Sequence, residues 1–248
     1  MTVSYHAYFE AAGEALRRLH ETQGVYIESA AGLLVEAIVS ARSIYSFGAS
    51  HSFMTTEELV FRTGGLMLVN PIYPHGMNLS VRPMTATSRM ERVLGLGSEM
   101  LAASTAKEGD VLLITSTSGR NAVAIDMAVE AHKRKIKTIG ITSLAYSSAV
   151  GSRHPSGKKV ADLCDVVIDN CAPLGDAAVE IPGFPQKVGP LSSVTGCAIV
   201  DALVAEVVSR LVARGVEPPV FMSANLDGGD AWNQRLLAEN RDRIHYMD

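Results

Sequence analysis

The chain has 248 residues, of which 47% are apolar and 19% are charged. This composition excludes an intrinsically disordered protein, and the length suits one large domain with a well-buried core. With 22 Lys and Arg against 26 Asp and Glu, the formal net charge is −4, so bulk charge favours neither nucleic acid nor an anionic membrane as a partner. The longest stretch without a charged side chain, residues 63–81, is interrupted by two prolines and a histidine, which excludes a membrane span there.

The first elements predicted along the chain are two helices within residues 4–42. Apolar residues recur at helical spacing in this segment, both before and after Gly24. We expect a helical hairpin over residues 1–42 that either covers an edge of a sheet or contacts a second subunit. The chain does not open with a basic segment followed by an apolar one, so we expect no signal peptide.

From residue 43 the pattern changes to short apolar runs separated by helical stretches. The runs are nearly continuous rather than alternating, as in strands buried on both faces of a parallel sheet. The predicted strands are residues 43–47, 66–70, 111–115, 138–142 and 166–169, and the predicted helices between them are residues 53–63, 89–107 and 121–135. The expected fold class is therefore α/β, with a doubly wound, mostly parallel five-stranded sheet in three αβα layers over residues 43–214.

A long loop and a long helix follow the last predicted strand. Residues 170–190 are rich in proline and glycine, and a loop of this length in a compact domain usually has a function. The helix predicted over residues 193–214 is apolar on more than one face, which indicates burial against both the sheet and a partner. We therefore expect a homodimer or homotetramer. The C-terminal extension, residues 215–248, forms either a simple glycine-rich turn or a lid on a neighbouring subunit's site.

Two loops that follow predicted strands carry hydroxyl side chains and lead into helices. In an open parallel sheet, ligands bind outside the carboxyl ends of the strands. Free backbone N–H groups at a helix N-terminus favour anions, and hydroxyl groups donate further hydrogen bonds. These loops predict one anionic, polyhydroxylated ligand that bridges neighbouring strands; the alternative is that the hydroxyls only cap two helices. The residues expected at the site are Ser50, His51 and Ser52 in the first loop, and Ser116, Thr117, Ser118, Gly119 and Asn121 in the second.

Cofactor and metal motifs are not found among these residues. Neither loop matches the P-loop motif or the glycine fingerprint of dinucleotide-binding domains, so no cofactor is expected. The three cysteines, Cys164, Cys171 and Cys197, are an odd number without the spacing of metal ligands, which is typical of a reduced, cytoplasmic compartment. No two histidines form a short ligand pair, so no metal is expected, although a zinc site assembled from distant loops stays open.

Several segments together resemble a known family. Residues 113–121, the helix after them and residues 138–143 look like the sugar isomerase (SIS) domain, and residues 48–50 look like its first phosphosugar loop. The resemblance covers about residues 43–214. More narrowly, the segments 152–158, 169–176 and 223–230 resemble a subgroup of stand-alone SIS proteins of uncertain activity, related to phosphoheptose isomerases.

The resemblance implies phosphosugar binding, often with aldose–ketose isomerisation, in dimers or tetramers with sites near subunit interfaces. It implies that Ser50, Ser116, Ser118 and Asn121 hold the sugar phosphate. Many family members carry Glu or Gln and then Thr after the Ser-Gly pair, whereas this chain has Arg120 and Asn121. Arg120 either adds charge to the phosphate site or faces solvent, so its role is open. Arg153 and Lys158 likewise either meet an anion or only solvate their loop.

Isomerisation through an enediol needs a base that moves a proton between adjacent carbons, and a group that opens the sugar ring. Glu57 and Glu58 lie on the helix after the first loop, where carboxylates lie in isomerases of this fold. Adjacent helical residues point about 100° apart, so only one faces the site, and we favour Glu58. The alternative is that both are solvated. His51 is the first candidate for ring opening, ahead of His75 and His154, and the carboxylate of Asp176, after the last strand, is placed to accept sugar hydroxyls.

The function expected from these residues is that of a cytoplasmic sugar-phosphate isomerase. The alternatives are an SIS-type lyase or etherase, an amino-sugar-phosphate deaminase, and a non-catalytic phosphosugar sensor or assembly factor. Regulators with this fold usually carry a helix-turn-helix domain. Only about 42 residues precede the first strand here, and they are predicted to form two helices, which disfavours a DNA-binding regulator.

Overall fold

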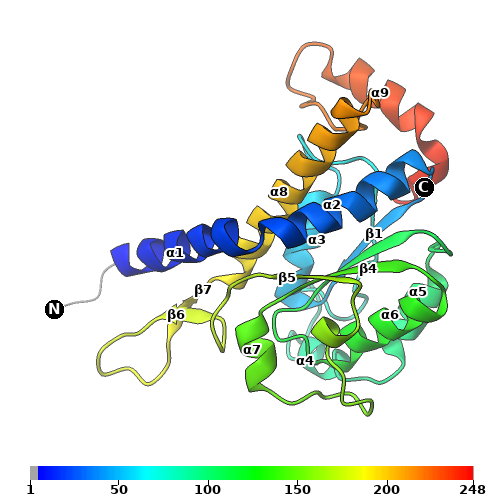
Figure 1. The fold of residues 1–248 in the computed structure, drawn as a ribbon. Coiled ribbons are helices and arrows are strands. Elements are labelled where there is room, and N and C mark those ends of the chain that lie inside the picture. Colours follow the sequence, from blue (N-terminus) through cyan, green and yellow to red (C-terminus); the bar gives the residue numbers. More distant parts are fainter. Residues whose placement is uncertain (1–4, 248) are drawn as a thin grey trace.

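A five-stranded parallel sheet forms the centre of the computed structural model, which describes residues 5–247 (Figure 1). The strand order is β2-β1-β3-β4-β5, and every neighbouring pair is parallel. The predicted α/β class and the strand count are confirmed. The strands are β1 (Ile44–Gly48), β2 (Val69–Pro71), β3 (Val111–Thr115), β4 (Lys137–Thr142) and β5 (Val166–Asp169).

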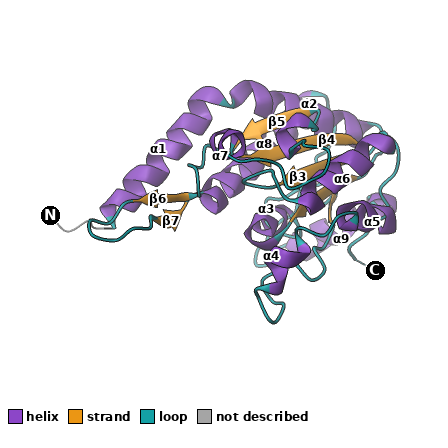
Figure 2. Ribbon diagram, turned by 90° about the horizontal axis from the view of Figure 1, so that it is seen from below, coloured by secondary structure: helices purple, strands orange, loops and turns teal. Residues whose placement is uncertain are grey.

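Helices cover both faces of this sheet and make three layers (Figure 2). Along β3, Val111 and Leu113 pack into one apolar cluster with α2 and α8, whereas Leu112 and Ile114 pack into a second cluster with α5 and α6. This alternation between two buried faces explains the continuous apolar run in the sequence. The helices are α1 (His6–Thr22), α2 (Gly24–Val39), α3 (Met54–Leu59), α4 (Ala86–Met90), α5 (Leu96–Ala103), α6 (Ala122–Lys133), α7 (Leu144–Ala149), α8 (Ser192–Ala213) and α9 (Gly229–Glu239), with short 3₁₀ turns η1 (Ser50–Phe53), η2 (Val160–Asp162) and η3 (Arg241–Arg243).

The two N-terminal helices are present, but they do not fold back on each other as a hairpin. The Tyr8 hydroxyl donates a hydrogen bond to the backbone just before α8, and at the other end of α8 Arg214 pairs with Glu36. α1 and α2 therefore follow α8 in the same direction (Figure 1). Only Gln23 separates them, and its side-chain oxygen accepts a hydrogen bond of 3.0 Å from the backbone N–H of Asp169 at the end of β5. One anchored residue leaves no loop in which the chain could reverse.

The single helix predicted over residues 89–107 is two short helices, α4 and α5. Gly95 precedes α5 with a φ of +82°, a backbone conformation that favours glycine. Its N–H donates to Asp126 Oδ2 at 2.7 Å. Gly97 lets α5 approach α6 closely, because a Cβ there would lie 2.0 Å from the carbonyl oxygen of Val123. The break leaves Glu91 at the end of α4, outside a regular helix.

The loop over residues 170–190 contains a structure that the sequence did not predict. Two short antiparallel strands, β6 (Ala177–Val179) and β7 (Val188–Pro190), form a hairpin beside α1. The strand predicted at residues 66–70 starts later, at Val69. Leu66 instead forms an antiparallel bridge with Val220 of the C-terminal extension.

The C-terminal extension contains α9 and packs against the amino ends of β1 and β2. The Tyr246 hydroxyl donates to the carbonyl oxygen of Met67, and the ring of His245 stacks on Tyr45. Buried residues from α1 and α2, from the sheet and from this extension share one apolar cluster. In its own subunit the extension thus lies away from the carboxyl ends of the strands, and its role as a lid on a neighbouring subunit stays a prediction. Within residues 5–247 no helix combines the length and the apolar character that crossing a membrane requires.

Candidate phosphate-binding site

The loops after β1 and β3 leave the sheet side by side. Gly48 of β1 is in register with Thr115 of β3, so both loops begin at the same level of the carboxyl edge. Position 48 accepts only glycine, because a Cβ there would lie 2.3 Å from the carbonyl oxygen of Ser52. The first loop therefore turns sharply through η1 into α3, which ends at Leu59 and is shorter than the helix predicted over residues 53–63.

The second loop contains backbone N–H groups that are not used by the protein's own described residues. Gly119 has a φ of +62°, and its N–H donates to the carbonyl oxygen of Ser116 at 3.0 Å. The carbonyl of Thr117 accepts a hydrogen bond from the backbone at the end of β4, which fixes the loop to the sheet. Among the residues that the structure describes, the N–H groups of Thr117, Ser118 and Arg120 have no acceptor. These groups, with the hydroxyls and the N-terminus of α6, form a set of donors suited to an anion.

Asn121 stands at the N-cap of α6, but its side chain does not cap the helix. Its Nδ2 donates to Glu91 Oε2 at 2.6 Å, and its Oδ1 accepts a hydrogen bond from Arg153 Nη1 at 2.8 Å. No side chain, hydroxyl or amide, therefore caps the start of α6 within the described residues.

Glu91 connects the two loops. Ser50 Oγ donates to Glu91 Oε1 at 2.5 Å, while Asn121 holds the other carboxylate oxygen. Ser50 has a φ of +53°, and its N–H donates to the carbonyl of Met77 at 2.8 Å. The chain Ser50–Glu91–Asn121–Arg153 thus places a carboxylate between the two loops, at hydrogen-bond distance from both.

Three arginines gather beside this chain of hydrogen bonds. Arg153 donates its backbone N–H to the carbonyl of Arg120 at 2.9 Å. Burial, together with the positive charges of Arg120 and Arg92, lowers the pKa of the Arg153 guanidinium. Within the described part of the chain, Arg120 Nε is buried and has no hydrogen-bond partner. This side of the site is therefore strongly positive.

The two carboxylates predicted to move protons lie on α3. Glu58 is largely buried and forms an ion pair with Arg62 at 2.6 Å. The pKa of the Cys197 thiol on α8 is raised first by burial and then by the negative charge of Glu58, so the two side chains lie near each other. Glu57 and His51 are exposed. The structure thus brings Ser50 and Asn121 together through Glu91, whereas Glu58 faces α8.

The other predicted ligands have structural partners of their own. Asp176 Oδ1 accepts from the backbone N–H groups of Leu191 and Ser192, so this carboxylate caps the start of α8. His154 Nε2 lies 3.1 Å from Asp126 Oδ1 on α6, and His75 is exposed after β2.

Possible metal ligands and thiols are distributed as follows in the described residues. In residues 5–247 no group of three or more His, Cys, Asp or Glu side chains is arranged to hold a metal ion. Burial raises the pKa of the Cys164 thiol to about 12, so this thiol is protonated at neutral pH.

Sequence reasoning missed Glu91 and Arg92 as site residues. Both fell inside a predicted continuous helix, where charged residues usually face solvent. The glycines at 95 and 97 were the available signal that this helix is broken. Arg153 was offered by the sequence either as an anion ligand or as a solvated loop residue, and the structure joins its side chain to Asn121.

Comparisons with known proteins give the family. The model of the SIS domain matches residues 7–143. A UPF0309 protein of Shouchella clausii is 42% identical over 240 residues, which cover 97% of this chain and 98% of the relative. Two solved structures have a similar fold. A phosphoheptose isomerase from Francisella tularensis has a TM-score of 0.55 and 15% identity, covering 82% of this chain and 95% of the other. The Vibrio vulnificus NanR protein complexed with ManNAc-6P has a TM-score of 0.53 and 17% identity, covering 94% and 67%. The chain belongs to the SIS domain family, among relatives named UPF0309 proteins.

Proposed function

We propose that this protein binds a sugar phosphate at the carboxyl edge of its sheet and interconverts its aldose and ketose forms. The observation that carries the proposal is the set of unpartnered N–H groups at residues 117, 118 and 120, beside the hydroxyls of Ser116 and Ser118 at the N-terminus of α6. Such a set suits a phosphate dianion. The names of two proteins with the same fold, a phosphoheptose isomerase and NanR complexed with ManNAc-6P, support this ligand class.

In this proposal Glu91 moves the proton. The carboxylate takes a proton from the hydroxyl-bearing carbon next to the carbonyl, and the carbonyl oxygen takes up a proton, which gives the enediol. The neighbouring hydroxyl then gives up its proton to form the new carbonyl, Glu91 returns its proton to the former carbonyl carbon, and no atom is gained or lost. Glu91 is favoured over Glu58 because Glu91 contacts residues of both loops, whereas Glu58 pairs with Arg62 on the face toward α8. Ser116, Ser118 and the free N–H groups would hold the phosphate and fix the sugar relative to this carboxylate.

A thermal-shift screen and an isomerase assay test the proposal. Purified protein is heated with a panel of aldose and ketose phosphates, with free sugars and inorganic phosphate as controls. A selective rise in Tm with one sugar phosphate, followed by conversion between its two forms, is the expected result. Replacing Ser116 and Ser118 together by alanine should abolish the shift, whereas Ser148→Ala, at an exposed serine on α7, should not. No shift with any phosphate, or release of ammonia or an acid fragment from the sugar, would contradict the isomerase.

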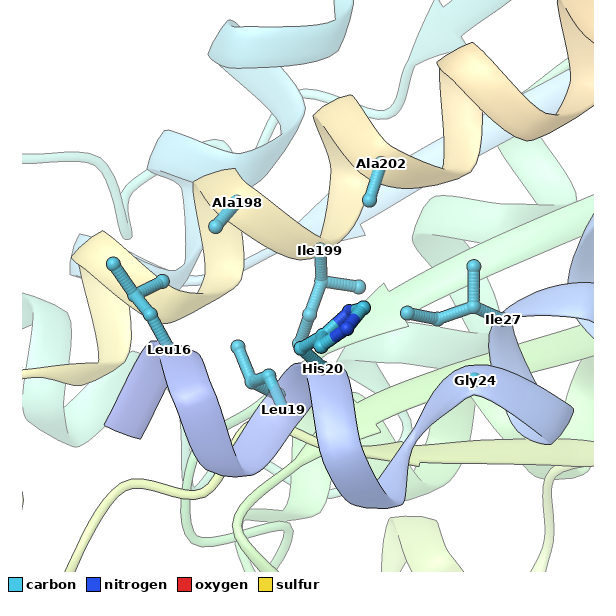
Figure 3. Close-up of a pocket in the computed structure, with 8 residues that line it drawn as sticks. All are labelled: Leu16, Leu19, His20, Gly24, Ile27, Ala198, Ile199 and Ala202. Atoms are coloured by element: carbon cyan, nitrogen blue, oxygen red, sulfur yellow. The ribbon is translucent and has the colours of Figure 1, made fainter. Parts of the chain in front are cut away.

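We also propose that the protein forms a homo-oligomer, in which the subunits associate through α1, α2 and α8. Figure 3 shows a largely apolar pocket of about 200 Å³ between these helices, lined by Leu16, Leu19, His20, Gly24, Ile27, Ala198, Ile199 and Ala202. Near the start of α1, Tyr5 and Phe9 are 69% and 67% exposed. A second copy that covers this face would bury these side chains, each worth roughly 1.5–3 kcal/mol when fully buried.

Sedimentation tests this association. Leu16→Glu places a charge in the pocket and should convert the oligomer to monomers, whereas Leu94→Glu, at an exposed leucine between α4 and α5, should leave it intact. A monomeric, active wild-type protein at low concentration would refute the oligomer. We also propose a cytoplasmic location, which the three free cysteines in the described residues support.

A further inference from the structure

The positive side of the site carries more charge than its own residues neutralise. The positive charges of Arg120 and Arg92 both act on Arg153, and the carboxylate that also acts on Arg153 is that of Glu91. Glu91 is already hydrogen bonded by Ser50 and Asn121. Within the described residues none of the three arginines forms an ion pair with a carboxylate.

A single phosphate group does not need these guanidinium groups. The three terminal oxygens of a phosphate accept about six hydrogen bonds. The second loop already offers the free N–H groups of Thr117, Ser118 and Arg120 and the hydroxyls at 116, 117 and 118. The guanidinium of Arg153 lies beside this set, because it donates to Asn121 Oδ1 at the end of the loop.

The position of Arg120 is unfavourable in the free protein. Its Nε is buried without a partner, which leaves a charged donor desolvated. The side chains of Arg92 and Arg153 are exposed and therefore accessible to a ligand. An anion at this position would give Arg120 Nε the partner that it lacks.

We infer that Arg92, Arg120 and Arg153 bind a second anionic group of the ligand, so that the ligand is a sugar phosphate that also carries a carboxylate or a second phosphate. This inference rests on the proposed phosphosugar function. Guanidinium groups bind carboxylates and phosphates through paired, charge-assisted hydrogen bonds. A carboxylate and a second phosphate would both be bound in this way, and the affinities of matched ligands distinguish them.

Calorimetric titration with matched ligands tests the inference. 6-Phosphogluconate is compared with glucitol 6-phosphate, which has a hydroxymethyl group in place of the carboxylate. Fructose 1,6-bisphosphate is compared with fructose 6-phosphate. We expect the doubly anionic member of at least one pair to bind about tenfold more tightly or better. The pair with the larger preference identifies carboxylate or phosphate as the second group.

Variants assign the preference to the cluster. Arg153→Gln and Arg120→Gln should each reduce the preference for the doubly anionic ligand to about threefold or less. Arg89→Gln, at an exposed arginine on α4, should keep the full preference. Equal binding within each pair would overturn the inference and leave the phosphosugar function standing. A preference that survives both variants would also overturn it. If neither the four sugar phosphates nor inorganic phosphate bind, both this inference and the proposed phosphosugar function are wrong.

Discussion

Replacing Glu91 by Gln should separate catalysis from binding. Asn121 Oδ1 accepts from Arg153, so its Nδ2 must keep facing residue 91. A glutamine would therefore turn its carbonyl oxygen to Asn121 and its amide to Ser50, whose hydroxyl can accept as well as donate. Both hydrogen bonds survive, and the geometry of the two loops is kept.

The magnitude of the effect follows from the charge that is lost. Hydrogen bonds to a charged group contribute about 1.5–3 kcal/mol, and neutral ones about 0.5–1.5 kcal/mol. Two bonds weakened in this way reduce the free energy of unfolding by about 2 kcal/mol, and removal of a carboxylate beside three arginines adds to this in the same direction. Since about 1 kcal/mol corresponds to roughly 2–4 °C for a chain of this size, Tm should fall by about 4–8 °C.

Turnover should fall far more than stability. Removal of a general base lowers kcat by about 10²–10⁴-fold. The Tm rise with the sugar phosphate should persist, because the N–H groups of the second loop are untouched and a nearby negative charge is gone. Glu99→Gln, at an exposed glutamate on α5, is the matched control and should change neither property. Wild-type turnover in the Glu91→Gln protein would refute its assignment as the base.

Two other substitutions test the remaining parts of the site. Gly119→Ala forces a side chain into a φ of +62° and places its Cβ 3.0 Å from Thr142 Oγ1; it should cost about 1–2 kcal/mol of stability and weaken phosphosugar binding, as measured by thermal denaturation with and without ligand. Glu58→Gln removes a partner of Arg62 and should leave kcat within a few-fold of wild type, with at most about 1 kcal/mol lost. Loss of turnover in this variant with binding retained would instead restore the sequence-based assignment of Glu58.

The fold was predictable because it depends on local patterns. The run at residues 111–115 is apolar at four consecutive positions, and this alone indicates a strand covered on both faces. The placement of both loops at one edge then follows from the parallel sheet. The prediction that the two N-terminal helices form a hairpin was wrong. The direction of the chain at Gln23 depends on a hydrogen bond from the distant backbone of Asp169, which no local pattern in the sequence reveals.

The centre of the candidate site was not predictable, because it depends on contacts between distant segments. Ser50 and Asn121 were selected from their positions after strands, but the group that joins them comes from the end of α4. Glu91 reaches them only because the helix breaks there and Gly97 lets α5 pack against α6. Arg153 comes from the loop after α7 in the same way. A single sequence shows which residue types are available for such a site, but it does not show which of them lie close together in the fold.

The strained backbone at Ser50 gives a test that combines stability with ligand binding. A non-glycine residue with a φ of +53° costs about 1–2 kcal/mol, and such strain is often found at functional sites. Here the strain is held by the hydrogen bonds of Ser50 N–H to Met77 and of Ser50 Oγ to Glu91. Ser50→Ala removes the bond to Glu91 and keeps the strain, whereas Ser50→Gly removes both.

The two variants should therefore differ in stability but agree in binding. Glycine relieves the strain but loses about 0.5–1 kcal/mol through its greater freedom in the unfolded chain. The net expectation is that Ser50→Gly unfolds a few degrees above Ser50→Ala, while both bind the sugar phosphate more weakly than wild type, since both lack the hydroxyl. If Ser50→Ala is the more stable of the two, the backbone at residue 50 does not store the strain energy that we assign to it. If Ser50→Gly binds as tightly as wild type, the hydroxyl does not contact the ligand, and the first loop serves only to position Glu91.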